Sequence, residues 1–244
     1  MAVASRQPLR PYPLEASVKK AVPAIALLLF CSGLACLASA GPAARSHRLA
    51  VLESQINAYT AAAGYKDDMY GLHVVRAALT SVREGSGGIG ACLVDSVTGQ
   101  VVETGRNRQY TPYFRSDFHA EMDLLNRYEN RVKKQRSGTG DLDPRHCPGL
   151  VLVTSMEPCP MCLARIINSG IKTVLYVEED KTGGMATRLN QLPPFWREFA
   201  ADREFRRAEC SPELRQMAHD LFHLSKREFA KKTRGSVLPS NNSN

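Results

Sequence analysis

The sequence has only one C-x-x-C pair, Cys159 and Cys162, and it contains no internal repeat. Because a zinc ribbon needs two such pairs, that class of structural zinc site is excluded. Five of the seven cysteines lie outside the N-terminal apolar run, and an odd number cannot complete a disulfide framework. Cys147 and Cys210 could still pair in an oxidising compartment, although nothing in the sequence requires it. The single pair therefore needs partners from elsewhere in the chain if it is to hold a metal.

The chain also has little excess charge. Its net charge is +8 at pH 7, and three of these units fall in the first 44 residues, which leaves +5 for the body. The stretch 127–146 contributes six basic and three acidic residues. This is thin support for a polyanionic partner, and a solvated basic surface is the simpler interpretation. Nucleic acid therefore remains a possible partner, but the composition does not favour it.

The first 40 residues are typical of a targeting segment. Lys19 and Lys20 precede an uncharged apolar run over 21–40, which ends in the small-residue sequence Ala38-Ser39-Ala40. This order predicts a secretory signal peptide that is cleaved before Gly41. The run is also about long enough to span a bilayer, so an uncleaved membrane anchor is the alternative. We accordingly expect a protein that is exported, to the periplasm or the medium, or anchored to the membrane.

Residues 45–234 are expected to form one folded domain, followed by a disordered tail at 235–244. A polar, Gly- and Pro-containing stretch at 131–149 predicts a long surface loop. Apolar periodicity and turn residues predict the regular elements. The expected helices cover 46–63, 67–84, 118–131, 159–169, 195–208 and 211–232, and the expected strands cover 88–95, 100–105, 149–155 and 171–177. Strands thus alternate with helices between 88 and 177, which predicts a three-layer α/β/α sandwich with a mixed sheet.

Cys159 and Cys162, taken together with His119 and Glu121, predict a catalytic metal site. Two thiolates and one imidazole form a three-ligand set for Zn²⁺ and leave the fourth position to water. A carboxylate beside that water can act as a general base, because zinc lowers the pKa of bound water to about 7. Cys159 and Cys162 are expected in the first turn of a helix, where the helix dipole stabilises thiolates. His119 and Glu121 are two residues apart and so do not share a helix face.

The motifs "HAE" at 119–121 and "PCPMC" at 158–162 fill the H-x-E…P-C-x-x-C pattern of zinc-dependent base deaminases. The chain resembles the nucleobase and nucleoside deaminases of the cytidine deaminase-like family over about residues 70–190. Within that family it is most similar to the branch with tRNA adenosine, guanine and cytosine deaminases. "SMEPCPMC", "SGIKTVLYVEEDKTGG" and "GACLVDSVTGQVVETGRNR" carry this resemblance.

The resemblance implies a cytidine deaminase-like fold and hydrolytic deamination, which is hydrolase chemistry at a C–N bond that releases ammonia. It also implies one Zn²⁺ per chain and a homodimer. The site residues that it implies are His119, Cys159 and Cys162 as zinc ligands, Glu121 as proton shuttle, and Asn107 with the backbone N–H of Ala120 as substrate contacts.

Three features depart from the nearest relatives in that branch, and one of them is the long interval from His119 to Cys159, which contains the stretch 127–146. The chain is predicted to be exported, and "YFRSDF" stands before "HAE" where the tRNA-acting enzymes have a D-P-T-like stretch. The leading hypothesis is therefore a deaminase of a free base or nucleoside, with cytosine, guanine and adenosine types all open. The alternatives are a polynucleotide deaminase acting on tRNA or a single strand, and an inactive zinc-stabilised binding protein. The intact Glu121 argues against the last, because a structural zinc site needs no general base.

Some other residues have simpler interpretations. Cys92 lies in an apolar strand and is expected to be a small core residue. Five further histidines, at 47, 73, 146, 219 and 223, show no ligand spacing and are expected to be structural or exposed. Phe195, Trp196 and Phe199 could close over a base, but core packing of an amphipathic helix is the favoured interpretation.

Overall fold

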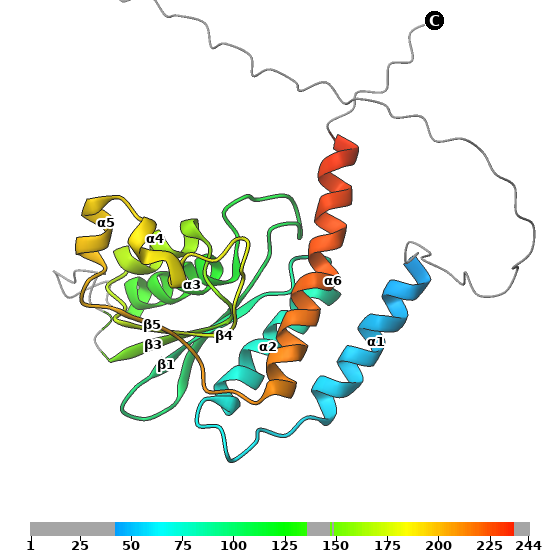
Figure 1. Cartoon of the computed structure of the whole chain (residues 1–244), viewed down its shortest axis with the longest axis horizontal. Helices are drawn as coiled ribbons and strands as arrows, with labels where there is room; N and C mark the ends of the chain where they lie inside the picture. Colours follow the sequence, from blue (N-terminus) through cyan, green and yellow to red (C-terminus); the bar gives the residue numbers. More distant parts are fainter. Residues whose placement is uncertain (1–41, 136–146, 148, 237–244) are drawn as a thin grey trace, which may run out of the picture. The chain divides into compact units, whose positions relative to one another are not determined.

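The computed structural model describes residues 42–135, 147 and 149–236 of the chain (Figure 1). The predicted targeting segment at 1–40, most of the predicted loop after 135 and the last eight residues lie outside this part. None of the helices in the described ranges has the length and hydropathy needed to cross a bilayer.

A five-stranded mixed sheet forms the centre of the domain, with strand order β2-β1-β3-β4-β5. β1 pairs in antiparallel fashion with both β2 and β3, whereas β3, β4 and β5 run parallel. A short turn allows the β1–β2 hairpin, while the parallel β3–β4 pair requires a crossover through a helix. The strands are β1 (Gly90–Asp95), β2 (Val101–Arg106), β3 (Leu150–Met156), β4 (Thr173–Glu178) and β5 (Glu204–Arg207).

Helices cover both faces of this sheet, as Figure 1 shows. Neighbouring residues of β1 point to opposite faces, so Cys92 and Val94 join one apolar cluster while Ala91 and Leu93 join the other. The first cluster is closed by α1 (Pro42–Ala58), α2 (Asp68–Arg83) and α6 (Pro212–Ser236). The second is closed by α3 (Ala120–Gln135) and α4 (Pro160–Asn168). The predicted three-layer α/β/α sandwich with a mixed sheet is confirmed, and Cys92 is a core residue as expected.

The helix predicted over 195–208 is wrong in its second half. The chain forms only α5 (Pro194–Phe199) and then turns into β5. β5 pairs in parallel with β4, and Phe205 lies opposite Val174 in this ladder. Pairing at the open edge of the sheet satisfies the backbone groups of β5, and this tertiary interaction outweighs the helical periodicity of the segment. A short 3₁₀ helix, η1 (Ala186–Gln191), precedes α5 and has no counterpart in the predictions.

The first predicted helix is shifted toward the N-terminus. It covers 42–58 instead of continuing to 63, because the buried carboxylate of Asp68 binds the chain beyond its end. Tyr59 donates a hydrogen bond of 2.6 Å to Asp68 Oδ2, and the backbone N–H of Ala62 donates one of 2.7 Å to the same atom. These bonds hold residues 59–62 in a connection between α1 and α2.

Cys147 and Cys210 do not form the disulfide that the sequence left open. Both are free thiols, as are the other described cysteines. Cys147 belongs to the cluster under α3 and α4, whereas Cys210 belongs to the cluster under α2 and α6. The sheet lies between the two clusters and therefore separates the two cysteines.

Candidate active site

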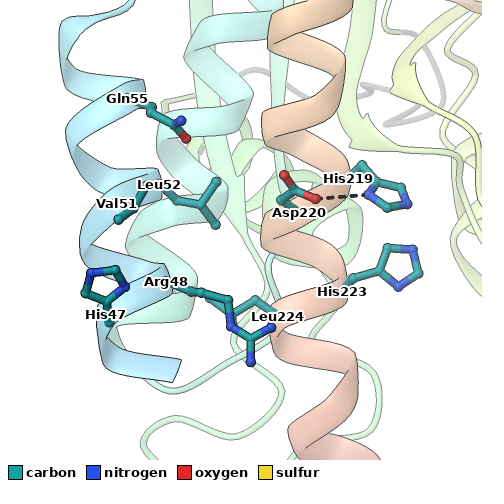
Figure 2. Close-up of a pocket in the computed structure, with 9 residues that line it drawn as sticks. All are labelled: His47, Arg48, Val51, Leu52, Gln55, His219, Asp220, His223 and Leu224. Atoms are coloured by element: carbon teal, nitrogen blue, oxygen red, sulfur yellow. Dashed lines mark hydrogen bonds and ion pairs between the residues drawn. The ribbon is translucent and has the colours of Figure 1, made fainter. Parts of the chain in front are cut away.

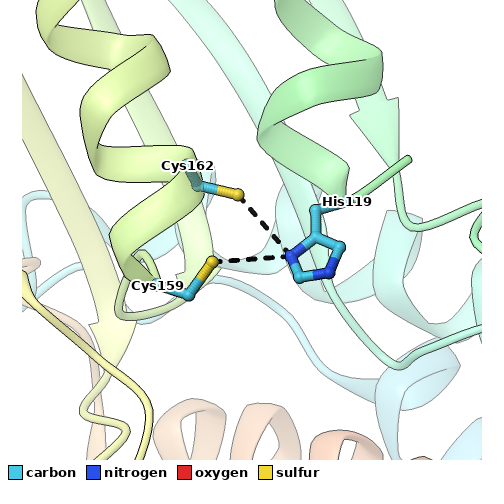
Figure 3. Close-up of side chains that lie close together, drawn as sticks. All are labelled: His119, Cys159 and Cys162. Atoms are coloured by element: carbon cyan, nitrogen blue, oxygen red, sulfur yellow. Dashed lines mark hydrogen bonds between the residues drawn. The ribbon is translucent and has the colours of Figure 1, made fainter. Parts of the chain in front are cut away.

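His119, Cys159 and Cys162 come together at one end of the sheet, although about forty residues separate the histidine from the cysteines (Figure 3). The sulfurs of Cys159 and Cys162 each lie 3.6 Å from Nδ1 of His119. The three ligating atoms all lie within 4.8 Å of one another, and no other group of three such residues is found in the described part of the chain. The predicted ligand set therefore forms one compact cluster.

Two helix N-termini position these ligands. Cys159 is the N-cap of α4, Pro160 follows at the first helical position, and the N–H of Leu163 donates to the Cys159 carbonyl. His119 directly precedes α3, and its carbonyl accepts the first i→i+4 bond, from the N–H of Asp123. Because both helices begin at the cluster, the positive ends of their dipoles face the sulfurs and favour thiolates.

The two cysteines share a proton in this arrangement. The pKa of Cys159 is lowered to about 4, chiefly because Cys162 donates a hydrogen bond to its sulfur, while His119 adds a smaller effect. The same bond raises the pKa of Cys162, and burial raises it further. The pKa of His119 is raised because it bonds to the Cys159 thiolate. Two sulfur donors and one imidazole nitrogen match the ligands of a borderline-soft cation such as Zn²⁺, which displaces the shared proton. The residues present thus fit a zinc ion.

Glu121 lies in the first turn of α3, and it is only 2% exposed. Its Oε1 accepts a hydrogen bond of 3.0 Å from the Thr154 hydroxyl, which projects from β3. Burial raises the pKa of the Glu121 carboxyl, and the negative charge on Cys159 raises it further. A carboxyl group with a raised pKa can both accept and donate a proton near neutral pH.

A cavity of about 300 Å³ opens beside this cluster. Its lining includes all three predicted ligands together with Glu121 and Asn107. Asn107 is buried, and its Oδ1 accepts hydrogen bonds from the N–H groups of Gly87 and Gln109 at 3.2 and 3.0 Å. Ala120 is also buried but does not belong to the cavity lining. As the first residue of α3 it carries a backbone N–H that the helix itself does not satisfy.

Several residues of the cavity were not anticipated from the sequence. Glu157 is buried and accepts bonds from Asp180 N–H at 3.2 Å and from the N–H and hydroxyl of Thr187 at 2.8 and 2.9 Å. It thereby holds the 180–187 loop against the site. The sequence did offer one signal for Glu157, which is its position between the apolar run of β3 and Pro158. Phe222 and Ser225 of α6 also line the cavity, and the amphipathic pattern of α6 gave no hint of this.

The aromatic residues of α5 do not approach the cavity. Phe195 is 65% exposed, while Trp196 packs in part against a small apolar cluster. The favoured interpretation, core packing, is therefore met only by Trp196. His73, in contrast, lies 2.8 Å from the Thr104 hydroxyl and has a structural role, as expected.

A larger cavity of about 640 Å³ lies between α1 and α6 (Figure 2). His47, His219 and His223 line it with Arg48 and Asp220, and the only bond among them in Figure 2 joins His219 Nδ1 and Asp220 Oδ1 at 3.2 Å. None of the zinc-site residues reaches this cavity. His47 and His223 are exposed, as expected, and His146 lies outside the described residues.

Comparisons with known proteins agree with this site. Residues 65–178 match the family described as the cytidine and deoxycytidylate deaminase zinc-binding region. The tRNA-specific adenosine deaminase of Bacillus subtilis (strain 168) is 28% identical over 127 residues, which cover 52% of this chain and 71% of that protein.

Two solved structures illustrate the structural matches. The guanine deaminase from Nitrosomonas europaea has 21% identity and a TM-score of 0.47, with coverage of 71% of this chain and 91% of that one. A structure from studies of A-to-I editing by tRNA deaminases at the wobble position of transfer RNA has 21% identity and a TM-score of 0.44. The matched region covers 61% of this chain and 94% of the chain in that structure.

Proposed function

We propose that this protein, whose residues 65–178 belong to the family of zinc-dependent cytidine and deoxycytidylate deaminases, releases ammonia from a nucleobase or a nucleoside by hydrolysis. The observation that carries the proposal is the pairing of the three-ligand cluster with a buried carboxylate, Glu121, in one cavity. A purely structural zinc site would complete its coordination with a fourth side chain and would need no adjacent base.

In this proposal His119 Nδ1 and the thiolates of Cys159 and Cys162 hold the zinc ion. Zinc bound by three protein ligands supplies an activated water, whose pKa it lowers to about 7, at its remaining position. The start of α4 at Cys159 favours the thiolate form of that sulfur, and metal binding would displace the proton that Cys162 carries. The protein thereby provides a nucleophile at neutral pH without a reactive side chain.

Glu121 moves the protons of the reaction. Its carboxylate accepts a proton from the attacking water and passes it to the ring nitrogen of the base. It then accepts the second proton, from the hydroxyl that the water leaves on the ring carbon, and passes it to the amino group as the C–N bond breaks and ammonia departs. The hydrogen bond from Thr154 to Oε1 holds the carboxylate in place through this transfer. The raised pKa of Glu121, which results from its burial, suits a group that must gain and lose a proton in each turnover.

Asn107 and Ala120 are proposed to contact the substrate. The atom of Asn107 that receives two N–H bonds must be the oxygen, so the amide nitrogen is left to donate. It can bond a carbonyl or ring nitrogen of the base. The N–H of Ala120, at the start of α3, is a second donor of the kind that helix N-termini offer.

A polynucleotide deaminase is the second candidate, supported by the similarity to the tRNA-specific adenosine deaminase of Bacillus subtilis. The charges near α3 give little support to a polynucleotide substrate. Arg127 and Arg131 both pair with Glu103, at 3.3 and 3.1 Å, so part of the basic stretch is neutralised within the protein. A steep loss of affinity for single-stranded RNA or DNA with rising salt would favour this candidate.

Two properties outside the site are also proposed. Export or membrane anchoring rests on the lysine pair and apolar run in residues 1–40. Mass spectrometry of the protein from its native host would detect a start at Gly41 if the segment is cleaved. A homodimer rests on the family resemblance, and light scattering of the purified protein would measure it.

The deciding experiment is an ammonia-release screen with zinc-loaded protein. The screen includes cytosine, guanine and adenine, their nucleosides and nucleotides, and single-stranded oligonucleotides. We expect release from at least one base or nucleoside, and a loss of about 10²- to 10⁴-fold in Glu121→Gln. Zinc content measured on the same samples should stay at one per chain in both proteins. Activity of Glu121→Gln equal to that of the parent protein would exclude the proposed role of this carboxylate.

A further inference from the structure

α6 forms one wall of the cavity, although it lies well beyond the residues 65–178 that carry the family match. Phe222 and Ser225 are the α6 residues in this wall. Phe222 is the one aromatic ring other than His119 among the lining residues of the described chain. An aromatic face beside a zinc cluster and a carboxylate is suited to a flat heteroaromatic ligand.

The position of Phe222 is fixed by a close approach of α6 to the loop before β1. The N–H of Gly88 donates to Ser225 Oγ at 2.9 Å, and Ser225 Oγ donates to the Phe222 carbonyl at 2.7 Å. A Cβ at Gly88 would lie 2.3 Å from the carbonyl oxygen of Leu221, so only glycine permits this contact. The Ser225 hydroxyl therefore connects the backbone of Phe222 to the loop before β1.

The same loop orients Asn107. Gly87 donates its N–H to Asn107 Oδ1, while the Ser81 hydroxyl contacts the carbonyl oxygens of Gly87 and Asn107, each at 2.5 Å. Gly87 and Gly88 are adjacent, so one short segment connects the polar group of Asn107 to the aromatic ring of Phe222. Both side chains line the cavity, so Asn107 can bond the edge of a ring while Phe222 packs on its face.

The dimensions of the cavity limit the ligand. Its volume of about 300 Å³ is at the lower end of the range for small-molecule sites. α6 lines one side, where Ser225 accepts the hydrogen bond from Gly88. A base that remains attached to a polynucleotide needs an open groove for the flanking backbone.

We propose that Phe222 is a specificity-determining residue, whose ring packs on the face of the substrate and whose place on α6 restricts the site to a free base. This inference rests on the proposed deaminase function and adds its substrate class. The ligand is a planar, aminated heterocycle with a carbonyl or ring nitrogen that accepts from Asn107. Nucleosides and polynucleotides are the competing classes.

The test compares Phe222→Ala and Phe222→Leu with the parent protein and with Phe195→Ala. Phe195 is an exposed phenylalanine of α5 outside the cavity, so its variant is the matched control. Each protein is assayed for kcat and KM with cytosine, guanine and adenine and with their nucleosides. Binding of uracil, xanthine and hypoxanthine, the deaminated products, gives a readout that needs no turnover. Zinc content and thermal unfolding are measured for all four proteins.

We expect Phe222→Ala to raise KM for the free base and weaken product binding by about tenfold or more, with a much smaller change in kcat. Phe222→Leu keeps apolar bulk and folding but loses the aromatic face, so its loss should be intermediate. Phe195→Ala should match the parent protein. Zinc content should not change in any variant.

Two results would overturn the inference while leaving the deaminase function intact. One is that both the Phe222→Leu and the Phe222→Ala proteins bind the product and turn over the base as well as the parent protein does. The other is a parent protein whose kcat/KM is higher for a nucleoside or an oligonucleotide than for every free base. A parent protein that holds zinc but releases no ammonia from any compound would instead remove the proposed function, and the inference with it.

Discussion

The hydroxyl of Thr154 donates a hydrogen bond of 3.0 Å to Oε1 of Glu121, and both residues are buried. Thr154 belongs to β3 and Glu121 to the first turn of α3, so the bond joins the central sheet to the helix that follows His119. A buried carboxylate without such a donor would be free to rotate and would be more costly to ionise. Thr154 therefore positions the carboxylate that we propose moves the protons.

Replacing Thr154 by valine tests this relationship. The side chain keeps its shape but loses its donor, so we expect kcat to fall by about tenfold or more while zinc content stays at one per chain. The pH–rate profile should shift its acidic limb upward, because an unpaired buried carboxylate holds its proton more strongly. Thr154→Ser retains the hydroxyl and should restore most of the rate. A Thr154→Val enzyme with the parent profile would show that the bond is not used in turnover.

Zinc binding should depend on each of the three ligands. Cys162→Ser replaces a buried sulfur with a hydroxyl that is a poor zinc ligand, so the purified variant should contain well under one zinc per chain and release no ammonia. Metal analysis and the ammonia assay measure this directly. Cys92→Ala is the matched control, because Cys92 is equally buried but lies in the sheet away from the cluster. Equal zinc content in Cys162→Ser and in the control would contradict the ligand assignment.

The structural cysteines should be unreactive in the native protein. Burial raises the pKa of Cys92 to about 12, and it also raises the pKa of Cys210 to about 12, where Asp68 contributes. A pH of 8 is well below both pKa values, so both thiols are protonated. Only a thiolate reacts with an alkylating reagent. Alkylation of zinc-loaded protein followed by peptide mass spectrometry should leave both unmodified until the protein is unfolded. Detection of a peptide that links Cys147 to Cys210 would contradict their placement on opposite faces of the sheet.

Gly88→Ala should separate α6 from the cavity loop. The added methyl group would lie 2.3 Å from the backbone oxygen of Leu221, and backbone cannot rotate away as a side chain does. We expect a loss of about 2 kcal/mol or more in the free energy of unfolding, which a thermal melt would show as a fall of roughly 5 °C. Gly64→Ala is the control, because its methyl group would meet no atom within 4 Å. Equal melting temperatures for the two variants would argue against the close contact of α6.

The metal cluster could be predicted from the sequence because zinc chemistry demands particular residue types at short local spacings. His119, Cys159 and Cys162 are brought together by two helix starts, and each start is marked locally, by the "HAE" and "PCPMC" motifs. The sandwich could be predicted for a similar reason. Alternating strands and helices have few ways to bury their apolar faces.

Contacts between distant segments could not be predicted in this way. The strand at 204–207 has helical periodicity and becomes a strand only because β4 offers it an edge. The expectation for Cys147 and Cys210 stayed open until the sheet was seen to separate them. Side-chain periodicity gives the face that a residue occupies only after its strand has been placed in the sheet.

The sequence by itself determined the layered fold and the cluster of His119, Cys159 and Cys162 with Glu121 beside it, because these depend on residue type and local spacing. Only the tertiary structure decided which residues complete the cavity. Glu157 lines it from the end of β3 and Phe222 lines it from α6, while Thr154 of β3 bonds the Glu121 carboxylate. The contact between Gly88 and Ser225 spans 137 residues, and no local pattern in the chain encodes it. It exists because the two backbones pack so closely at Gly88 that there is no room for a Cβ atom, and only glycine lacks one.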